Sequence, residues 1–220
     1  MLCSMDTKNK NIKVTGIIIK EEDYKEYDKL LTILTKEYGK IKAYAFGIRR
    51  HNSKSIGKAR LFTFANFDLK VIKDSYQLDN ISLIESFEEL SNDYNNYCYA
   101  SYFLELADYF EYENVESDKM IDLIYWTFKA LILNKVPNNL IRRIYELKIL
   151  KYQGIYKDSI NLPTNNETLI YTWDFIIKTE PSKLYSFKLK DNIYKLFDDE
   201  MKIEMRNNVS NKMKTLEFLK

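Results

Sequence analysis

Cysteine, histidine, glycine and proline are all scarce in this sequence of 220 residues. It contains two cysteines, Cys3 and Cys98, and a single histidine, His51. Two cysteines do not make the disulfide framework of a small secreted domain, and with one histidine they cannot fill a four-ligand zinc site without carboxylates. A nucleophilic site of the Ser-His-Asp or Cys-His type would need His51, which lies in a basic segment without a matching motif.

Long apolar runs and catalytic motifs are also missing. The longest apolar stretches have a few residues, whereas a membrane span needs ~20. The N-terminal "MLCSMDTKNKN" is polar and lacks the apolar core of a signal peptide. The sequence has no phosphate-binding loop, no paired-carboxylate signature and no cofactor-binding glycine motif. We therefore expect a cytoplasmic protein that is not an enzyme, uses no cofactor and does not bind a membrane.

Acidic residues are absent from residues 38–67, although the chain as a whole is nearly neutral. This window has a charge of +7, and because the whole chain has +2, the remainder carries −5. Clustered, uncompensated positive charge is the electrostatic footprint of a polyanion partner, and a solvated face is the alternative explanation. The seven cations are Lys40, Lys42, Arg49, Arg50, Lys54, Lys58 and Arg60.

The hydropathy pattern of residues 1–87 has the period of two that is typical of β-strands. Five β-rich stretches follow one another: "IKVTGIIIK", "LLTILTKE", "KIKAYAFGI", "LFTFANFDLKVI" and "YQLDNISLIESF". Four of the five glycines lie at or before Gly57, where turns between strands need them. The pattern predicts a small barrel or sandwich after a flexible tail over residues 1–11. In the third stretch, Ile41, Ala43 and Ala45 alternate with Lys42, Tyr44 and Phe46.

From residue 88 onward the apolar residues recur at helical spacing. Pro137 is expected to separate the second and third helices, and Gly154 to end the third. A further apolar element over residues 169–178 and a closing helix or helix pair over residues 191–220 complete the pattern. The fold class is therefore α+β, with an all-helical domain over residues 88–220. The first three helical stripes comprise Tyr99, Tyr102, Phe103, Leu106 and Phe110, then Ile121, Ile124, Phe128, Leu131 and Ile132, then Leu140, Ile144, Leu147 and Leu150.

The order of these features resembles a known family. The stretch "TGIIIKEEDYKEYDKLLTILTKEYGKIKAYAFGIRRHNSK" resembles the N-terminal domain of the bacterial recombination mediator RecO, and "ASYFLELAD", "YELKILKYQG" and "KMKTLEFL" resemble its helical segments. The likeness covers nearly the whole chain in the right order. The N-terminal residues that carry it are Asp28, Leu30, Leu31, Thr32, Thr35, Gly39, Lys40, Ala45, Gly47, Arg49, Arg50 and Ser53.

The resemblance implies an OB-fold barrel followed by a helical domain. It also implies a nucleoid-associated mediator of DNA repair and homologous recombination. Such a protein binds single- and double-stranded DNA, anneals complementary strands, works with RecR, and helps to load RecA onto DNA coated with single-strand-binding protein. The alternative function is a generic OB-fold module for single-stranded nucleic acid with a helical partner-docking domain. A third is a helical structural adaptor with incidental basic charge.

The chain departs from the family pattern in one place. Many members of the family carry a four-cysteine zinc module after the helix that corresponds to "YELKILKYQG". Here that place holds "IYKDSINLPTNNETL", which contains no cysteine. The helical domain over residues 88–220 is therefore expected to lack the zinc module, and no metal site is predicted.

The basic window is the predicted DNA-binding site. Arginine and lysine in a glycine-flanked loop follow a phosphate backbone without reading bases, so Arg49 and Arg50 are the leading candidates. Tyr44 and Phe46 offer rings on which bases can stack, or alternatively pack under the helical domain. The predicted DNA-binding residues are Lys40, Lys42, Tyr44, Arg49, Arg50, Lys54, Lys58 and Arg60.

A second site is predicted on the helical domain. The resemblance implies that this domain binds the acidic, hydrophobic C-terminal tail of single-strand-binding protein. An anionic tail with a terminal aromatic residue needs an apolar groove edged by cations. Arg142 and Arg143, at the start of the third helical stripe, are the candidates, with Lys129 as a third. The alternative is that all three are ordinary solvated helix charges.

Overall fold

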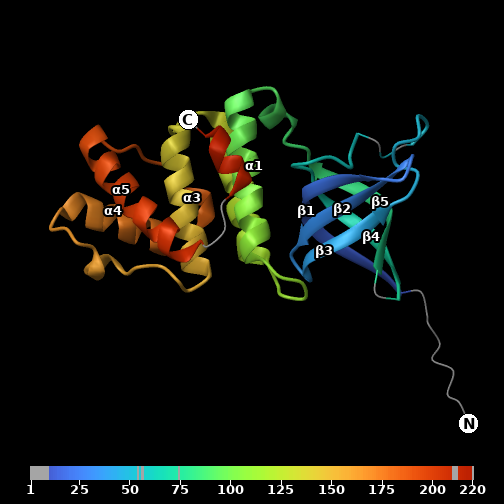
Figure 1. Ribbon diagram of the computed structural model, residues 1–220, viewed down its shortest axis with the longest axis horizontal. Coiled ribbons are helices and arrows are strands. Elements are labelled where there is room, and N and C mark those ends of the chain that lie inside the picture. The colour runs from blue at the N-terminus through green and yellow to red at the C-terminus, as the bar shows by residue number, and fades with distance from the viewer. Residues whose placement is uncertain (1–9, 54, 56, 74, 210–212, 220) are drawn as a thin grey trace, which may run out of the picture. The chain divides into compact units, whose positions relative to one another are not determined.

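The structure of the protein is a computed structural model, and it describes residues 10–53, 55, 57–73, 75–209 and 213–219. The described chain forms five strands followed by five α-helices, with four short 3-10 helices between or after them (Figure 1). It divides into two compact units. The first contains the strands together with Glu111–Ile121, and the second contains Glu89–Phe110 and the chain from Asp122 onward.

The strands close into a five-stranded barrel in the order β1-β2-β3-β5-β4. All neighbouring pairs are antiparallel except β3 and β5, which are parallel. This topology, followed by helices, confirms the α+β fold class with an N-terminal OB-fold barrel. The strands are β1 (Lys10–Tyr24), β2 (Asp28–Thr35), β3 (Gly39–Ala45), β4 (Phe64–Ile72) and β5 (Ser75–Glu85).

Two strand boundaries differ from the sequence prediction. The prediction of a flexible tail over residues 1–11 is wrong for Lys10 and Asn11, which pair with β4; the rest of that tail lies outside the described residues. The alternation also predicted a strand from residue 61, but β4 starts at Phe64. Phe62 has a φ of +70° and is buried, so the chain turns there before the strand begins.

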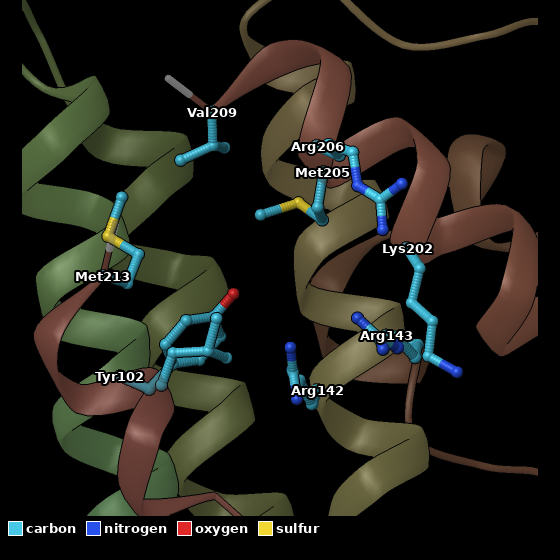
Figure 2. Close-up of a pocket in the computed structure, with 9 residues that line it drawn as sticks. Tyr102, Arg142, Arg143, Lys202, Met205, Arg206, Val209 and Met213 are labelled. Carbon is cyan, nitrogen blue, oxygen red and sulfur yellow. The ribbon is translucent and has the colours of Figure 1, made fainter. Parts of the chain in front are cut away.

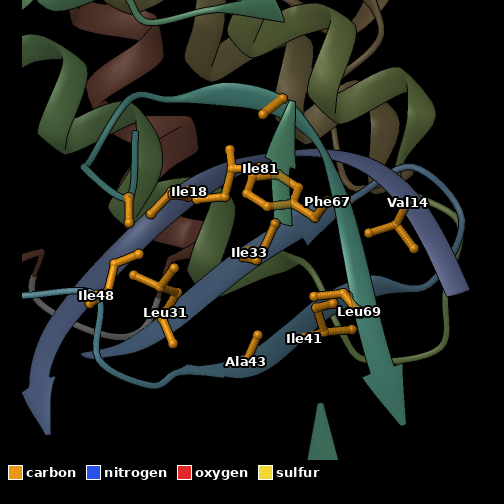
Figure 3. Packing of buried hydrophobic residues seen from close by; sticks show 13 residues of the cluster. Val14, Ile18, Leu31, Ile33, Ile41, Ala43, Ile48, Phe67, Leu69 and Ile81 are labelled. Carbon is orange, nitrogen blue, oxygen red and sulfur yellow. The ribbon is translucent and has the colours of Figure 1, made fainter. Parts of the chain in front are cut away.

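The barrel core follows from the alternation in the strands. Ile41, Ala43 and Ala45 of β3 are buried, whereas Lys42 and Phe46 are exposed. Because successive side chains of a strand point to opposite faces, one face of each strand fills the barrel. Figure 3 shows this interior, in which residues of β3 meet residues of the other four strands. The labelled members are Val14, Ile18, Leu31, Ile33, Ile41, Ala43, Ile48, Phe67, Leu69 and Ile81.

The segment Glu111–Ile121 belongs to the barrel unit, although the sequence prediction placed it in the helical domain. Gly39 forms an isolated bridge with Glu113, and the backbone N–H of Lys40 donates to the carbonyl of Tyr112 at 3.1 Å. Gly39 has a φ of +62°, and a Cβ there would lie 2.2 Å from the Tyr112 carbonyl oxygen. Glycine is therefore required where this segment crosses the start of β3.

The helices agree with the apolar stripes. Pro137 is the N-cap residue of α3, and Gly154, with a φ of +71°, follows its C-terminal end. The closing segment forms α5 and a 3-10 helix over Lys214–Phe218. Among the described residues, no helix is both long and apolar enough to cross a membrane. The helices are α1 (Tyr94–Phe110), α2 (Asp118–Leu133), α3 (Asn138–Tyr152), α4 (Glu167–Lys178) and α5 (Asp191–Asn208).

Candidate nucleic-acid interface and peptide pocket

The turn after β3 presents Arg49 and Arg50. Its backbone is anchored to the turn between β1 and β2, because the N–H of Gly47 donates to Asp28 Oδ1 at 2.7 Å and the N–H of Arg49 donates to the carbonyl of Tyr27 at 3.0 Å. Gly47 has a φ of +65°, which an L-residue rarely adopts. The turn is thus a fixed platform with two exposed arginines.

The side chains of these arginines make only surface contacts. Arg49 Nη1 lies 3.0 Å from Asp23 Oδ2, and the two side chains are 38% and 63% exposed. The guanidinium carbon of Arg50 lies 5.6 Å from the centroid of the Tyr27 ring. Exposed pairs of this kind contribute about 0–1 kcal/mol, so a phosphate group can replace Asp23 at little cost.

The other cations of the basic window fall into distinct groups. Lys42 and Arg60 are exposed and form no ion pair with any described residue. Lys40 is half-buried on β3. Lys58 is also half-buried, and its Nζ donates to the carbonyl of Ile81 at 3.4 Å, which holds it against β5 rather than in an open loop. Lys54 lies outside the described residues.

Aromatic rings lie on the outer face of the barrel, at the end of β3 that leads into the turn. The Tyr44 ring is 5.1 Å from the Tyr24 ring and 5.9 Å from the Phe46 ring, to which it is almost parallel at 7°. Tyr44 is half-buried, and Phe46 is 51% exposed. Lys25 Nζ lies 5.2 Å from the centroid of Tyr24. These rings and the cations beside them suit an unpaired polynucleotide, because a ring face accepts any base.

The helical unit contains a pocket of about 240 Å³. Its lining comes from α1, α3, α5 and the segment 213–216, and Figure 2 shows Tyr102 and Met213 facing Arg142 and Arg143 across it. The lining is apolar on one part and cationic on another. The apolar part comprises Met205, Val209, Met213 and Leu216, and the cationic part comprises Arg142, Arg143, Lys202 and Arg206.

Arg142 and Arg143 share one buried carboxylate. Arg142 Nε donates to Glu146 Oε1 at 2.8 Å, and Arg143 Nη1 donates to Glu146 Oε2 at 2.6 Å. Arg143 Nε also donates to Asp198 Oδ1 at 2.7 Å, and the Tyr102 hydroxyl donates to Glu146 at 2.6 Å. The arginine side chains are 19% and 5% exposed. They are therefore not solvated helix charges, as the alternative explanation supposed.

The protonation of this cluster is fixed by burial and by the Glu146 carboxylate. Burial disfavours the charged guanidinium of Arg143, but the ion pair with Glu146 outweighs it, so the pKa of Arg143 lies above its usual value. The pKa of Arg142 is raised by the same balance. Burial, with the negative charge of Glu146, holds the pKa of Tyr102 well above its usual value. The cluster keeps its two positive charges at any physiological pH.

The structure does not bring Lys129 to this pocket, so a role for it in binding the tail stays a prediction. This lysine lies on α2 with its Nζ 5.7 Å from the Tyr125 ring, and it is not among the described residues that line the pocket. Sequence reasoning missed Lys202 and Arg206, which do line it. Their spacing of four residues places them on one face of α5. Two cations at that spacing, with Met205 between them, could have indicated a cation-edged apolar groove from the sequence alone.

No group of three or more His, Cys, Asp or Glu side chains is placed to hold a metal ion within the part of the chain that the structure describes. Cys98 is buried and forms no disulfide with a described residue. The absence of zinc from the protein stays a prediction.

Comparison with known proteins adds two kinds of match. The family models described as Recombination protein O N terminal and Recombination protein O C terminal match residues 8–88 and 91–159. DNA repair protein RecO of Caldicellulosiruptor bescii is 37% identical over 148 residues, which make up 67% of this chain and 60% of the relative.

Two further relatives carry the same name. DNA repair protein RecO of Clostridium kluyveri is 34% identical over 142 residues, or 64% of this chain and 55% of the relative. DNA repair protein RecO of Alkaliphilus metalliredigens is 27% identical over 188 residues, or 83% of this chain and 76% of the relative. The matches to the first two relatives span little more than half of their length.

Proposed function

The chain belongs to the recombination protein O family, and from this premise we propose that it is a DNA repair and recombination mediator. In this proposal it binds single- and double-stranded DNA, anneals complementary strands, and helps to load RecA onto DNA coated with single-strand-binding protein, with RecR as its partner. The names of its relatives support a role in DNA repair.

The mechanism needs no bond chemistry. Cations on the barrel neutralise phosphates, and the release of counterions supplies most of the affinity. The Tyr44 and Phe46 rings add stacking of ~1–3 kcal/mol per base. Two strands held on one protein no longer repel each other fully, after which base pairing drives annealing. The observation that carries this proposal is the anchored turn that exposes Arg49 and Arg50, together with the stacked Tyr44 and Phe46 rings at the end of β3.

The helical pocket is proposed to bind the C-terminal tail of single-strand-binding protein. An acidic tail that ends in an aromatic residue needs an apolar cavity for the ring and cations for the carboxylates. Met205 and Met213 supply adaptable apolar contacts. Because Arg142 and Arg143 are held by Glu146 and Lys202 is paired with Asp198 and Asp199, the exposed Arg206, which forms no ion pair with a described residue, is the cation most available to the carboxylates of the tail.

A peptide titration tests this pocket. The isolated tail peptide is titrated against the wild type, Arg206→Ala, and the matched control Lys119→Ala, which removes an exposed cation of α2. We expect Arg206→Ala to weaken peptide binding roughly fivefold, as for the loss of one exposed ion pair, and the control to bind like the wild type. Equal affinities for all three proteins would remove α5 from the site.

An annealing assay tests the function as a whole. Complementary oligonucleotides are mixed with and without single-strand-binding protein, and the rate of duplex formation is followed. A mediator should accelerate annealing in both conditions. Binding of single strands without acceleration would instead support the generic OB-fold binding module.

A further inference from the structure

A second cavity lies in the helical unit, apart from the pocket beside Arg142. It has a volume of about 300 Å³ and lies between α4 and the loop that precedes α5. Three of its seven lining residues are aromatic: Tyr171, Phe175 and Phe187. Tyr171 and Phe175, four residues apart on α4, stack at 6.5 Å with an angle of 27°, and Phe187 packs edge-on to Phe175 at 5.4 Å.

The helix and the loop hold these rings in place. Trp173 and Ile176 turn the opposite face of α4 into the core, so Tyr171 is left 70% exposed. The loop is anchored because Leu184 is buried and the hydroxyls of Tyr185 and Thr127 lie 2.5 Å apart. Phe187, two residues after Tyr185, packs against Phe175 from this anchored loop.

The chain that leads from α4 into α5 is rich in lysine. Between residues 181 and 197 there are four lysines and one carboxylate, Asp191. All four lysines are exposed, and none forms an ion pair with a residue that the structure describes. Lys188 lines the cavity itself. The lysines are Lys183, Lys188, Lys190 and Lys195.

We propose that this surface is a second contact for single-stranded nucleic acid, in which a base stacks against Tyr171 and Phe175 while the lysines hold the flanking phosphates. The two cavities of the helical unit differ in the way that this assignment needs. The apolar part of the pocket beside Arg142 is mostly aliphatic, which suits a peptide side chain. The cavity at Tyr171 contains three rings and one lysine, which suit a flat base and its phosphate without sequence selectivity.

This inference extends the proposed DNA-binding function, because annealing requires two strands and a second surface gives the second strand a place to bind. It names a site on the helical unit that is distinct from the barrel's basic turn. The proposal and the function of the barrel can therefore fail separately.

The test uses the full chain and a fluorescent oligothymidine of thirty nucleotides. Binding is measured for the wild type, Tyr171→Ala, Tyr171→Phe and Lys188→Ala/Lys190→Ala, with Lys178→Ala as the matched control, because Lys178 is an exposed α4 lysine already paired with Asp174. Photocrosslinking with an iododeoxyuridine oligonucleotide then locates the contact by mass spectrometry.

We expect Tyr171→Ala to weaken binding roughly fivefold or more through lost stacking, while Tyr171→Phe retains the ring and the affinity. Lys188→Ala/Lys190→Ala should make the slope of log K against log salt less steep by about 1.4. Lys178→Ala should change neither the affinity nor this slope. Crosslinks should map to Tyr171, Phe175 or Phe187.

Three results would overturn the inference. Wild-type affinity of Tyr171→Ala, with crosslinks confined to the barrel, would refute this surface and leave the proposed function intact. Failure of the wild type to bind any oligonucleotide would refute both. Crosslinking of this cavity to an acidic peptide with a photoreactive phenylalanine, but not to the oligonucleotide, would assign the surface to a protein partner.

Discussion

Two pairs of neighbouring arginines stand in this chain, and the two units hold them in opposite ways. On the barrel, Arg49 is 38% exposed and its partner Asp23 is 63% exposed. In the helical unit, Arg143 is 5% exposed and its partner Glu146 is fully buried. Identical dipeptides therefore have different roles. Arg49 and Arg50 are available to an outside anion. Arg142 and Arg143 form ion pairs within the protein and line the pocket.

The largest effect on stability is expected from removing the carboxylate that both arginines of α3 share. Glu146→Gln keeps the volume and some hydrogen bonding, but it leaves Arg142 without its ion-pair partner and Arg143 with Asp198 alone. Loss of one partner of a buried ion pair costs ~3–5 kcal/mol. We expect a loss of that size in the free energy of unfolding, measured with urea.

The control for this substitution is Asp199→Asn, which removes an exposed carboxylate from α5 and should leave stability within ~0.5 kcal/mol of the wild type. Equal stabilities of Glu146→Gln and Asp199→Asn would show that the arginines of α3 are not committed to the interior.

Lys148 is a further buried cation of α3, and its burial makes stability depend on pH. Its ammonium donates to the carbonyls of Ile176, Ile177 and Thr179, yet burial, aided by the charge of Lys151, lowers its pKa to about 8. In the unfolded chain the usual lysine pKa of 10.5 applies. Between these values the unfolded state binds more protons, so stability should rise with pH from about 8 toward 10.

The measurement compares urea unfolding at pH 7.5 and at pH 9.5. The free energy of unfolding should increase more for the wild type than for Lys148→Met, which cannot release the proton. At higher pH the buried Tyr152, with a pKa raised to about 12, acts in the opposite direction. The same pH dependence in both proteins would place the proton release elsewhere.

The smallest effect is expected from metal removal. The segment after α3 has no cysteine, so elemental analysis of the purified protein should find no stoichiometric zinc. A chelator should leave the melting temperature unchanged. One tightly held zinc ion per chain would show that the helical unit contains a metal site built from other ligands.

Local pattern was enough to predict the barrel strands and the helices. The alternation through Ile41, Ala43 and Ala45 predicted β3, and Pro137 and Gly154 predicted the ends of α3. The sequence did not predict that Glu111–Ile121 returns to the barrel, because its bridge to Gly39 joins residues far apart in sequence. The start of β4 was also missed, because alternation continues through a turn at Phe62.

The basic turn and the pocket beside Arg142 also differ in how far the sequence predicts them. A charge count found the basic turn, because residues 38–67 hold seven cations and no carboxylate. The burial of Arg143 depends in part on Asp198, which is 55 residues away, and no local pattern reports that contact. Glu146, three residues after Arg143, was the one local sign that these arginines are paired.

The most direct test of the account is the salt dependence of single-strand binding by the barrel's basic turn. If four cations of the basic window each neutralise one phosphate, the slope of log K against log salt should be roughly −3, and near −1.5 for Arg49→Ala/Arg50→Ala. The loss should be the same for every sequence, because backbone contacts carry no base information. Lys13→Ala, an exposed barrel cation outside the basic window, is the control. Wild-type affinity and an unchanged slope in the double variant would contradict the account and assign the turn to a protein partner.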